Sequence, residues 1–235
     1  LTIPIGGATL TLTSPDPAAN YDLNRINLSL SIDGDPPFER DVALALLSDP
    51  RVVPTAAATR QGPVSGVEVA PGISSFRKIP FAQPPVDQLR WRAPQPPEIR
   101  SQALDGTVFG PGCPQPPGAG FFNGAPATQS EDCLQLNVWR PAGAGPFPVM
   151  VWIHGGGLTQ GSAVQLSGGE LFYDGARLAE LGVVLVSLNY RLGPLGYLAQ
   201  RDLVAEAPDH PRSGNYGLLD QIQALRWIGE NIGYF

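Results

Sequence analysis

The sequence predicts an α/β fold built around a central mixed, mostly parallel sheet. Apolar runs of strand length alternate along the chain with segments of helical periodicity. One of these runs, residues 183–188, is apolar at almost every position, which is typical of a strand buried on both faces of a sheet. Together these two observations indicate a sheet that is covered by helices on both faces.

The first part of the chain has a different pattern, and we interpret residues 1–60 as an N-terminal appendage of strands plus a short helix. Apolar and polar residues alternate over 9–13 and 26–32, which is the period of a half-buried strand. Residues 38–47 follow two prolines and are expected to form the short helix. The main domain is then expected to span residues 61–235.

The main domain begins with a hairpin signal and ends with a long helical pattern. Residues 63–69 and 72–79 are expected to pair as a hairpin with Gly72 in the turn. The remaining expected elements are strands at 133–139 and 148–154, a helix over 174–181 that ends at Gly182, the strand at 183–188, and a long helix marked by Leu218, Leu219, Ile222, Leu225 and Ile232.

Composition excludes several classes of function. The formal net charge of the 235-residue chain is −6, which makes nucleic acid a poor partner. No apolar run approaches the roughly 18 residues of a membrane span. Two histidines and two cysteines at unrelated spacings predict no metal site, and no motif predicts a cofactor.

One glycine run has a chemical interpretation. Residues 149–153 are apolar and lead directly into His154-Gly155-Gly156-Gly157. Glycines let a backbone approach a ligand closely, and fixed backbone N–H groups stabilise the oxyanion that forms when an acyl carbonyl is attacked. The position after an apolar strand suits ligand binding in an α/β sheet. A plain tight turn is the alternative, whereas a dinucleotide loop is excluded because Gln160 stands where glycine is needed.

A matching nucleophile motif is absent from the sequence. No Gly-x-Ser-x-Gly occurs between Leu1 and Phe235, and Gly72-Ile73-Ser74-Ser75-Phe76 fails at its last position. His154 at a strand end and His210 in a loop context are therefore read as structural and surface residues, not as a general base. Cys113 and Cys133 are either two buried thiols or one disulfide, and their spacing alone does not decide between them.

Several ordered segments resemble the type-B carboxylesterase and cholinesterase family of α/β-hydrolases. The segments lie between about residue 62 and Phe235 and include the glycine run. The others are Phe76-Arg77-Lys78-Ile79-Pro80-Phe81-Ala82-Gln83-Pro84-Pro85, Leu89-Arg90-Trp91, Glu131-Asp132-Cys133-Leu134-Gln135-Leu136-Asn137-Val138-Trp139, Asn189-Tyr190-Arg191-Leu192-Gly193 and Gly214-Asn215-Tyr216-Gly217-Leu218-Leu219-Asp220-Gln221.

This resemblance implies the N-terminal portion of an α/β-hydrolase fold and a set of residue roles. Gly156 and Gly157 are expected to donate two oxyanion hydrogen bonds, and Gly155 and Leu158 to contact substrate. A Cys113–Cys133 disulfide and a buried Arg90–Glu131 ion pair are expected as structural features. The disulfide in turn favours an oxidising compartment, so we expect a secreted or periplasmic protein.

Departures from the family pattern limit these expectations. Lys78 and Asp87 stand where the family usually has glycine, and Leu158 replaces a frequent aromatic residue. The loop between the cysteines contains Phe121 and Phe122 but no tryptophan, so choline recognition is not predicted.

The leading hypothesis is a serine carboxylesterase acting on a small-molecule or lipid-like ester without a cofactor. Serine, acid and histidine are expected on a missing or separate C-terminal segment, with a complementing C-terminal chain of the same precursor as the partner. This chain alone is therefore expected to be inactive and to expose an open sheet edge. The triple-glycine pattern favours a site that accepts bulky alcohols. The alternative is a non-catalytic cholinesterase-like binding or adhesion module, which the intact glycine run disfavours.

Overall fold

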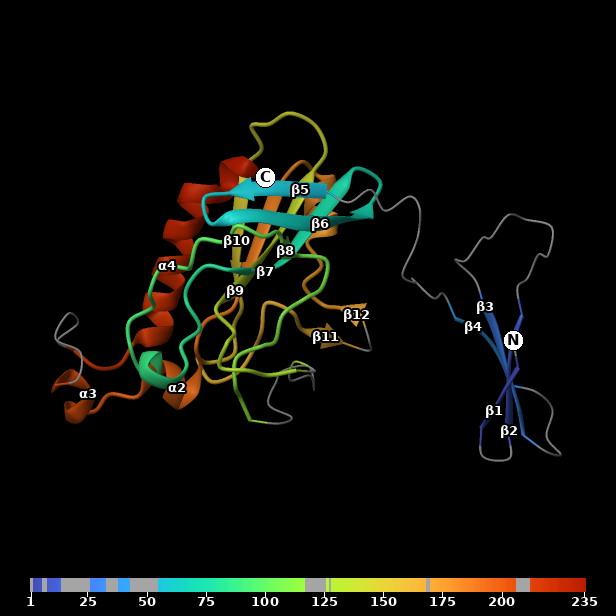
Figure 1. The fold of residues 1–235 in the computed structure, drawn as a ribbon, viewed down its shortest axis with the longest axis horizontal. Helices are drawn as coiled ribbons and strands as arrows, with labels where there is room; N and C mark the ends of the chain where they lie inside the picture. The colour runs from blue at the N-terminus through green and yellow to red at the C-terminus, as the bar shows by residue number, and fades with distance from the viewer. Residues whose placement is uncertain are drawn as a thin grey trace. The chain divides into compact units, whose positions relative to one another are not determined.

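Two units make up the chain, Leu1–Val52 and Val53–Phe235. They are shown in the computed structural model of Figure 1. The structure describes residues 2–5, 8–13, 26–32, 38–42, 55–116, 126, 128–167, 170–205 and 212–235.

The first unit contains a four-stranded antiparallel sheet. Its strands follow chain order, β1 (Thr2–Ile5), β2 (Ala8–Thr13), β3 (Ile26–Ile32) and β4 (Phe38–Val42). The helix expected from residue 38 is wrong over Phe38–Val42, because this segment pairs with β3 as a strand; residues 43–47 lie outside the described residues. Prolines before a segment mark a turn as well as a helix start, and pairing with a neighbouring strand decided between them.

The second unit is built on a mixed seven-stranded sheet with the strand order β10-β13-β9-β7-β6-β5, and β8 beside β6. A separate two-stranded ribbon and four short or long helices complete it (Figure 1). The sheet strands are β5 (Thr55–Thr59), β6 (Gly62–Ala70), β7 (Ile73–Pro80), β8 (Leu104–Asp105), β9 (Gln135–Pro141), β10 (Val149–Ile153) and β13 (Val184–Leu188). The other elements are β11 (Leu166–Ser167), β12 (Glu170–Leu171), α1 (Ala176–Glu180), α2 (Gly193–Tyr197), α3 (Arg201–Ala205), α4 (Tyr216–Asn231) and 3-10 turns at Asp87–Leu89 and Ile232–Tyr234.

The mixed α/β architecture is confirmed, and so is the β6–β7 hairpin with Gly72 at a positive φ of 74° in its turn. The expectation of a mostly parallel sheet is wrong for these strands. In this sheet β10–β13 and β6–β8 pair in parallel, whereas the other neighbouring strands pair antiparallel. Parallel neighbours need a long crossover connection, and α1 lies in the connection between β10 and β13. β5 pairs with β6, so Thr55–Thr59 belongs to the second unit and not to the appendage.

The core lies on both faces of this sheet. Every residue of β13 is buried, as the apolar run predicts. Because side chains alternate along a strand, Val184, Val186 and Leu188 share one face and Leu185 lies on the other. The first face packs against Ala224, Trp227 and Ile228 of α4, whereas Leu185 packs with Ala176 and Ala179 of α1.

Helix α4 is present as predicted, but the leucine and isoleucine stripe that marks it is not its buried face. Leu218, Ile222 and Leu225 are 50%, 39% and 47% exposed. The buried face instead includes Asp220 and Trp227. Periodicity identifies a helix with an apolar stripe but does not determine which side packs on a given sheet.

Lys78 lies in a β-bulge of β7 and has a left-handed backbone, with φ at 56°. A side chain in this region costs about 1–2 kcal/mol, whereas glycine loses about 0.5–1 kcal/mol of unfolded-state freedom. We therefore expect Lys78→Gly to raise the free energy of unfolding by about 0.5–1 kcal/mol. Urea denaturation measures this change. Lys78→Ala keeps the strained backbone and serves as the control, and equal midpoints for the two variants would contradict the explanation.

Candidate active site

The glycine run leaves the sheet at the end of β10. Gly156, Gly157 and Leu158 have φ values of 119°, 61° and 63°, so three successive residues adopt positive φ. Glycine adopts such angles freely, whereas Leu158 holds a conformation that costs a leucine energy. The Leu158 side chain is 47% exposed at the turn. Its carbonyl accepts a hydrogen bond from the Gly193 N–H at 2.8 Å, which ties the turn to the start of α2.

The turn closes on the carbonyl of Gly156. The N–H groups of Thr159 and Gln160 both donate to this oxygen at 3.2 Å. Among the described residues, neither the Gly156 N–H nor the Gly157 N–H donates to a protein group. The N–H groups of Gly155 and Leu158 on either side also donate to no described group, so the turn presents a run of backbone donors without protein partners, as an oxyanion hole requires.

His154 is a buried structural residue at the base of this loop. Its ring is 3% exposed and stacks on Tyr190 with 4.4 Å between the ring centroids. Its Nδ1 lies 2.9 Å from the Gly155 carbonyl, which only accepts, so Nδ1 carries the proton. The Tyr190 hydroxyl donates to the His154 carbonyl at 2.9 Å. These contacts hold the peptide groups immediately before the two free donors.

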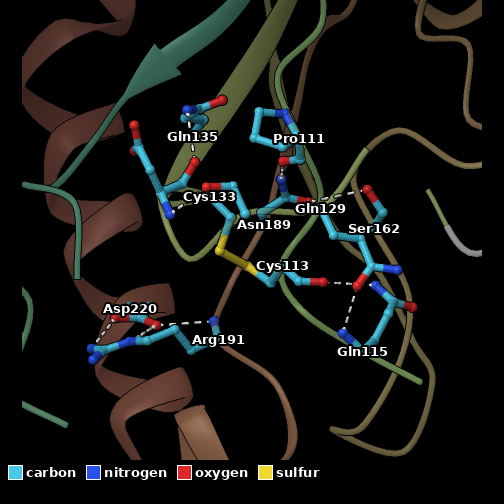
Figure 2. The surroundings of a disulfide bond; sticks show 12 residues. Pro111, Cys113, Gln115, Gln129, Cys133, Gln135, Ser162, Asn189, Arg191 and Asp220 are labelled. Atoms are coloured by element: carbon cyan, nitrogen blue, oxygen red, sulfur yellow. Dashed lines mark hydrogen bonds and ion pairs between the residues drawn. A yellow bond between two sulfur atoms is a disulfide. The ribbon is translucent and has the colours of Figure 1, made fainter. Parts of the chain in front are cut away.

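The cysteines form a disulfide (Figure 2). Cys113 and Cys133 are 1% and 0% exposed. Asn189 donates from Nδ2 to the Pro111 carbonyl at 3.1 Å, and its Oδ1 accepts from the Ala163 N–H at 2.8 Å. The side chain of Asn189 therefore connects the segment of the first cysteine to the segment that follows the glycine turn.

Two ion pairs differ sharply in their surroundings. Arg90 and Glu131 form the expected two-pronged pair at 2.6 and 2.7 Å, but their side chains are 38% and 25% exposed. The expectation of a buried pair is therefore wrong, because both side chains reach the surface. The buried pair is Arg191–Asp220, with both side chains at most 3% exposed. Burial raises the pKa of Asp220, and hydrogen bonding and charge from Arg191 oppose that rise.

The outer edge of the sheet is formed by β10, which in the described part of the chain pairs only with β13. Its side chains are apolar and exposed on both faces, with Val149, Met150, Trp152 and Ile153 between 39% and 45% exposed. An apolar edge strand is a surface on which another strand can pair, because one row of its backbone N–H and C=O groups is unpaired and its apolar side chains are exposed to solvent.

Burial of His154 predicts a pH dependence of stability. Burial lowers the pKa of His154, and the hydrogen bond to the Gly155 carbonyl opposes this only in part. The unfolded chain, with a histidine pKa of about 6.5, then takes up the proton before the folded chain does. We expect the free energy of unfolding to fall as pH decreases below about 6.5, and to fall less in His154→Gln. Urea midpoints between pH 8 and 5 measure both profiles, and parallel profiles would contradict the prediction.

Comparison with known proteins places the chain in a family. The sequence model described as "Carboxylesterase family" matches residues 51–235. The chain belongs to the carboxylesterase family. A fumonisin B1 esterase from Sphingopyxis macrogoltabida is 45% identical over 193 residues, which cover 81% of this chain and 34% of that protein. A para-nitrobenzyl esterase from Bacillus subtilis is 44% identical over 181 residues, covering 75% of this chain and 35% of that protein.

Solved structures of the carboxylesterase family show the same fold. One named PNB esterase has a TM-score of 0.62 at 45% identity, and a thermophilic PNB esterase has a TM-score of 0.65 at 43% identity. The two matches cover 77% of this chain and 35% and 36% of those chains. The expected α/β-hydrolase fold is confirmed, and the chain spans about a third of the length of these relatives.

Some features of the candidate site had no signal in the sequence. Gln115, which hydrogen-bonds the loop after the glycines, carries no motif, and Tyr190, Arg191 and Asp220 occur in family-like segments without an evident role. Their partners are 29 to 46 residues away, so only the folded chain shows the contacts. His210, Phe121 and Phe122 lie outside the described residues. In the part of the chain that the structure describes, no helix is long and apolar enough to cross a membrane.

Proposed function

We propose that this chain supplies the oxyanion hole of a serine carboxylesterase, with Gly156 and Gly157 as the two donors. The observation that carries the proposal is the pair of unpartnered backbone N–H groups at the end of an apolar edge strand. A third donor is expected after the nucleophilic serine. Gly155 and Leu158 flank the donors and are proposed to contact the substrate.

The nucleophile, acid and base are proposed to come from the part of the carboxylesterase fold that residues 1–235 do not cover. The apolar side chains of β10 support this proposal. A strand that is apolar at every position is typical of the centre of a sheet, yet β10 lies at the edge of the described sheet. The relatives support it as well, since this chain covers 34% and 35% of two of them. A strand added beside β10 would place a serine next to the glycine turn.

The reaction follows from this arrangement. The serine oxygen attacks the ester carbonyl while histidine takes its proton, and the carbonyl oxygen becomes an anion. The Gly156 and Gly157 N–H groups stabilise that anion before the alcohol leaves with the proton. Water then attacks the acyl-serine, forms a second oxyanion in the same place, and releases the acid.

The substrate class and the compartment are proposed from two further features, the exposed turn at Leu158 and the disulfide. A small-molecule or lipid-like ester is the proposed substrate, and the exposed turn at Leu158 favours a site open to bulky alcohols. The Cys113–Cys133 disulfide favours a secreted or periplasmic protein, because disulfides persist in oxidising compartments.

Mass spectrometry of the active esterase purified from its source tests this assignment. We expect this chain to accompany, or to be part of, a polypeptide that carries Gly-x-Ser-x-Gly, with the serine labelled by a fluorophosphonate. A single 24.9 kDa species with full esterase activity would refute the proposal. A complementing segment with no serine at that position would instead favour a binding module.

Hydrolysis of a series from acetates of primary alcohols to esters of tertiary alcohols tests the substrate size, and failure on every bulky ester would overturn that part.

A further inference from the structure

The side-chain amide of Gln115 hydrogen-bonds both the carbonyl and the N–H of one glycine, Gly161. Its Nε2 donates to the Gly161 carbonyl at 2.8 Å, and its Oε1 accepts from the Gly161 N–H at 2.9 Å. The same Nε2 reaches the Cys113 carbonyl at 3.1 Å. A primary amide carries a donor and an acceptor side by side, which lets one glutamine side chain bond both the N–H and the carbonyl of a single residue.

Gly161 in turn packs on the peptide that begins the glycine turn. Its φ is 111°, which favours glycine. A Cβ at this position would overlap the Gly155 carbonyl oxygen and Nδ1 of His154. The Gly161 backbone therefore lies in direct contact with the group that precedes Gly156, and any shift of Gly161 would be transmitted to the donors.

Gln115 is itself held in a well-anchored segment (Figure 2). Its own N–H donates to Oε1 of Gln129 at 2.9 Å, and Cys113 two residues earlier is bonded to Cys133. Gly112 adds backbone hydrogen bonds with Thr128 and Ser130 at 3.0 Å. The Gln115 amide therefore connects a segment held by the disulfide to the residue that follows the glycine turn, and the two positions are 46 residues apart in sequence.

We propose that Gln115 is a positioning residue for the oxyanion loop: it holds Gly161, and through Gly161 the Gly155–Gly157 backbone, in the geometry that accepts the oxyanion. This inference rests on the proposed esterase function for its catalytic consequence. Gln115 itself touches no reacting atom. Fixed donors are effective because they need no reorganisation during the reaction, and a displacement of about 1 Å costs up to 10²-fold in rate.

The first test measures the loop without any chemistry. Gln115→Met keeps the length of the side chain and removes both hydrogen bonds. We expect amide exchange in peptides covering residues 154–162 to accelerate about 10-fold or more, while exchange in α4 stays unchanged. Gln95→Met is the matched control, because Gln95 is exposed and, among the described residues, its side-chain amide bonds to the nearby Ala93 carbonyl. Unchanged exchange in residues 154–162 of Gln115→Met would overturn the proposal.

The second test uses the assembled esterase, with its serine-bearing segment, and p-nitrophenyl acetate. We expect kcat of Gln115→Met to fall about 10- to 100-fold with KM within about 2-fold, since the donors act on the transition state. Gln115→Glu keeps the acceptor for the Gly161 N–H but sets a carboxylate oxygen against the Gly161 and Cys113 carbonyls, so its kcat should be no higher than that of Gln115→Met.

The two readouts separate this proposal from the function on which it rests. A wild-type assembly without esterase activity would refute the proposed function, and the exchange experiment would still decide the role of Gln115. A kcat of Gln115→Met equal to wild type, or a loss confined to KM, would overturn the positioning role in an enzyme that is otherwise active.

Discussion

Gly156→Ala is expected to lower kcat of the assembled esterase by about 10²–10³-fold, the loss measured when one oxyanion donor is removed. The φ of Gly156 is 119°, and a Cβ there would overlap the carbonyl oxygen of Gln160. That carbonyl belongs to the residue whose N–H closes the turn on Gly156. The alanine variant must therefore rearrange the turn, which displaces the N–H groups of both Gly156 and Gly157.

Two further glycine variants make this test specific. Gly155→Ala meets no atom within 4 Å and has no positive φ, so we expect a smaller loss than for Gly156→Ala. Gly229→Ala, in helix α4, also meets no atom within 4 Å and serves as the control for the substitution itself. Steady-state kinetics with p-nitrophenyl acetate measure all three. A kcat of Gly156→Ala within about 3-fold of wild type would show that this turn does not hold the oxyanion.

Arg191→Met is expected to destabilise the second unit by about 3–5 kcal/mol, the cost of leaving a buried charge without its partner. Asp220 accepts three hydrogen bonds from Arg191, from Nε at 2.8 Å, from Nη2 at 2.7 Å and from the backbone N–H at 3.0 Å. Asp220 is 0% exposed, so its carboxylate loses its two guanidinium hydrogen bonds in a buried setting when Arg191 is replaced. Urea denaturation of the chain measures the loss.

A double-mutant cycle measures the interaction energy between Arg191 and Asp220 separately from the loss caused by each substitution alone. Arg191→Met combined with Asp220→Leu removes both charges, and we expect the pair to lose less stability than the sum of the single variants. Arg90→Met is the matched control, because Arg90 pairs with Glu131 at the surface and should matter far less. Additive losses at Arg191 and Asp220 would contradict a coupled buried pair.

Local patterns predicted several of the main elements of this fold. The β6–β7 hairpin, the buried strand β13 and the helix α4 all have a periodicity or a turn residue that a short window contains. The disulfide was implied by the family-like segment around Cys133 and is present in the structure. These features depend on neighbours in sequence or on an ordered set of motifs.

What the sequence did not reveal depends on which surfaces meet in the fold. The segment Phe38–Val42 is a strand because Leu30 and its neighbours pair with it. The apolar stripe of α4 is exposed because Trp227 and Asp220, on another side of the helix, face the rest of the domain. The hydrogen bonds from Gln115 to Gly161 cross 46 residues, and no periodicity connects two such positions.

The most direct test of the central claim is complementation with p-nitrophenyl acetate. This chain and a serine-bearing C-terminal segment from the same precursor are assayed separately and then mixed. We predict no hydrolysis by either part above the uncatalysed rate, and activity that appears on mixing and is lost with Gly156→Ala. Full hydrolysis by this chain alone would contradict the account, and so would a stable complex of the two parts that remains inactive.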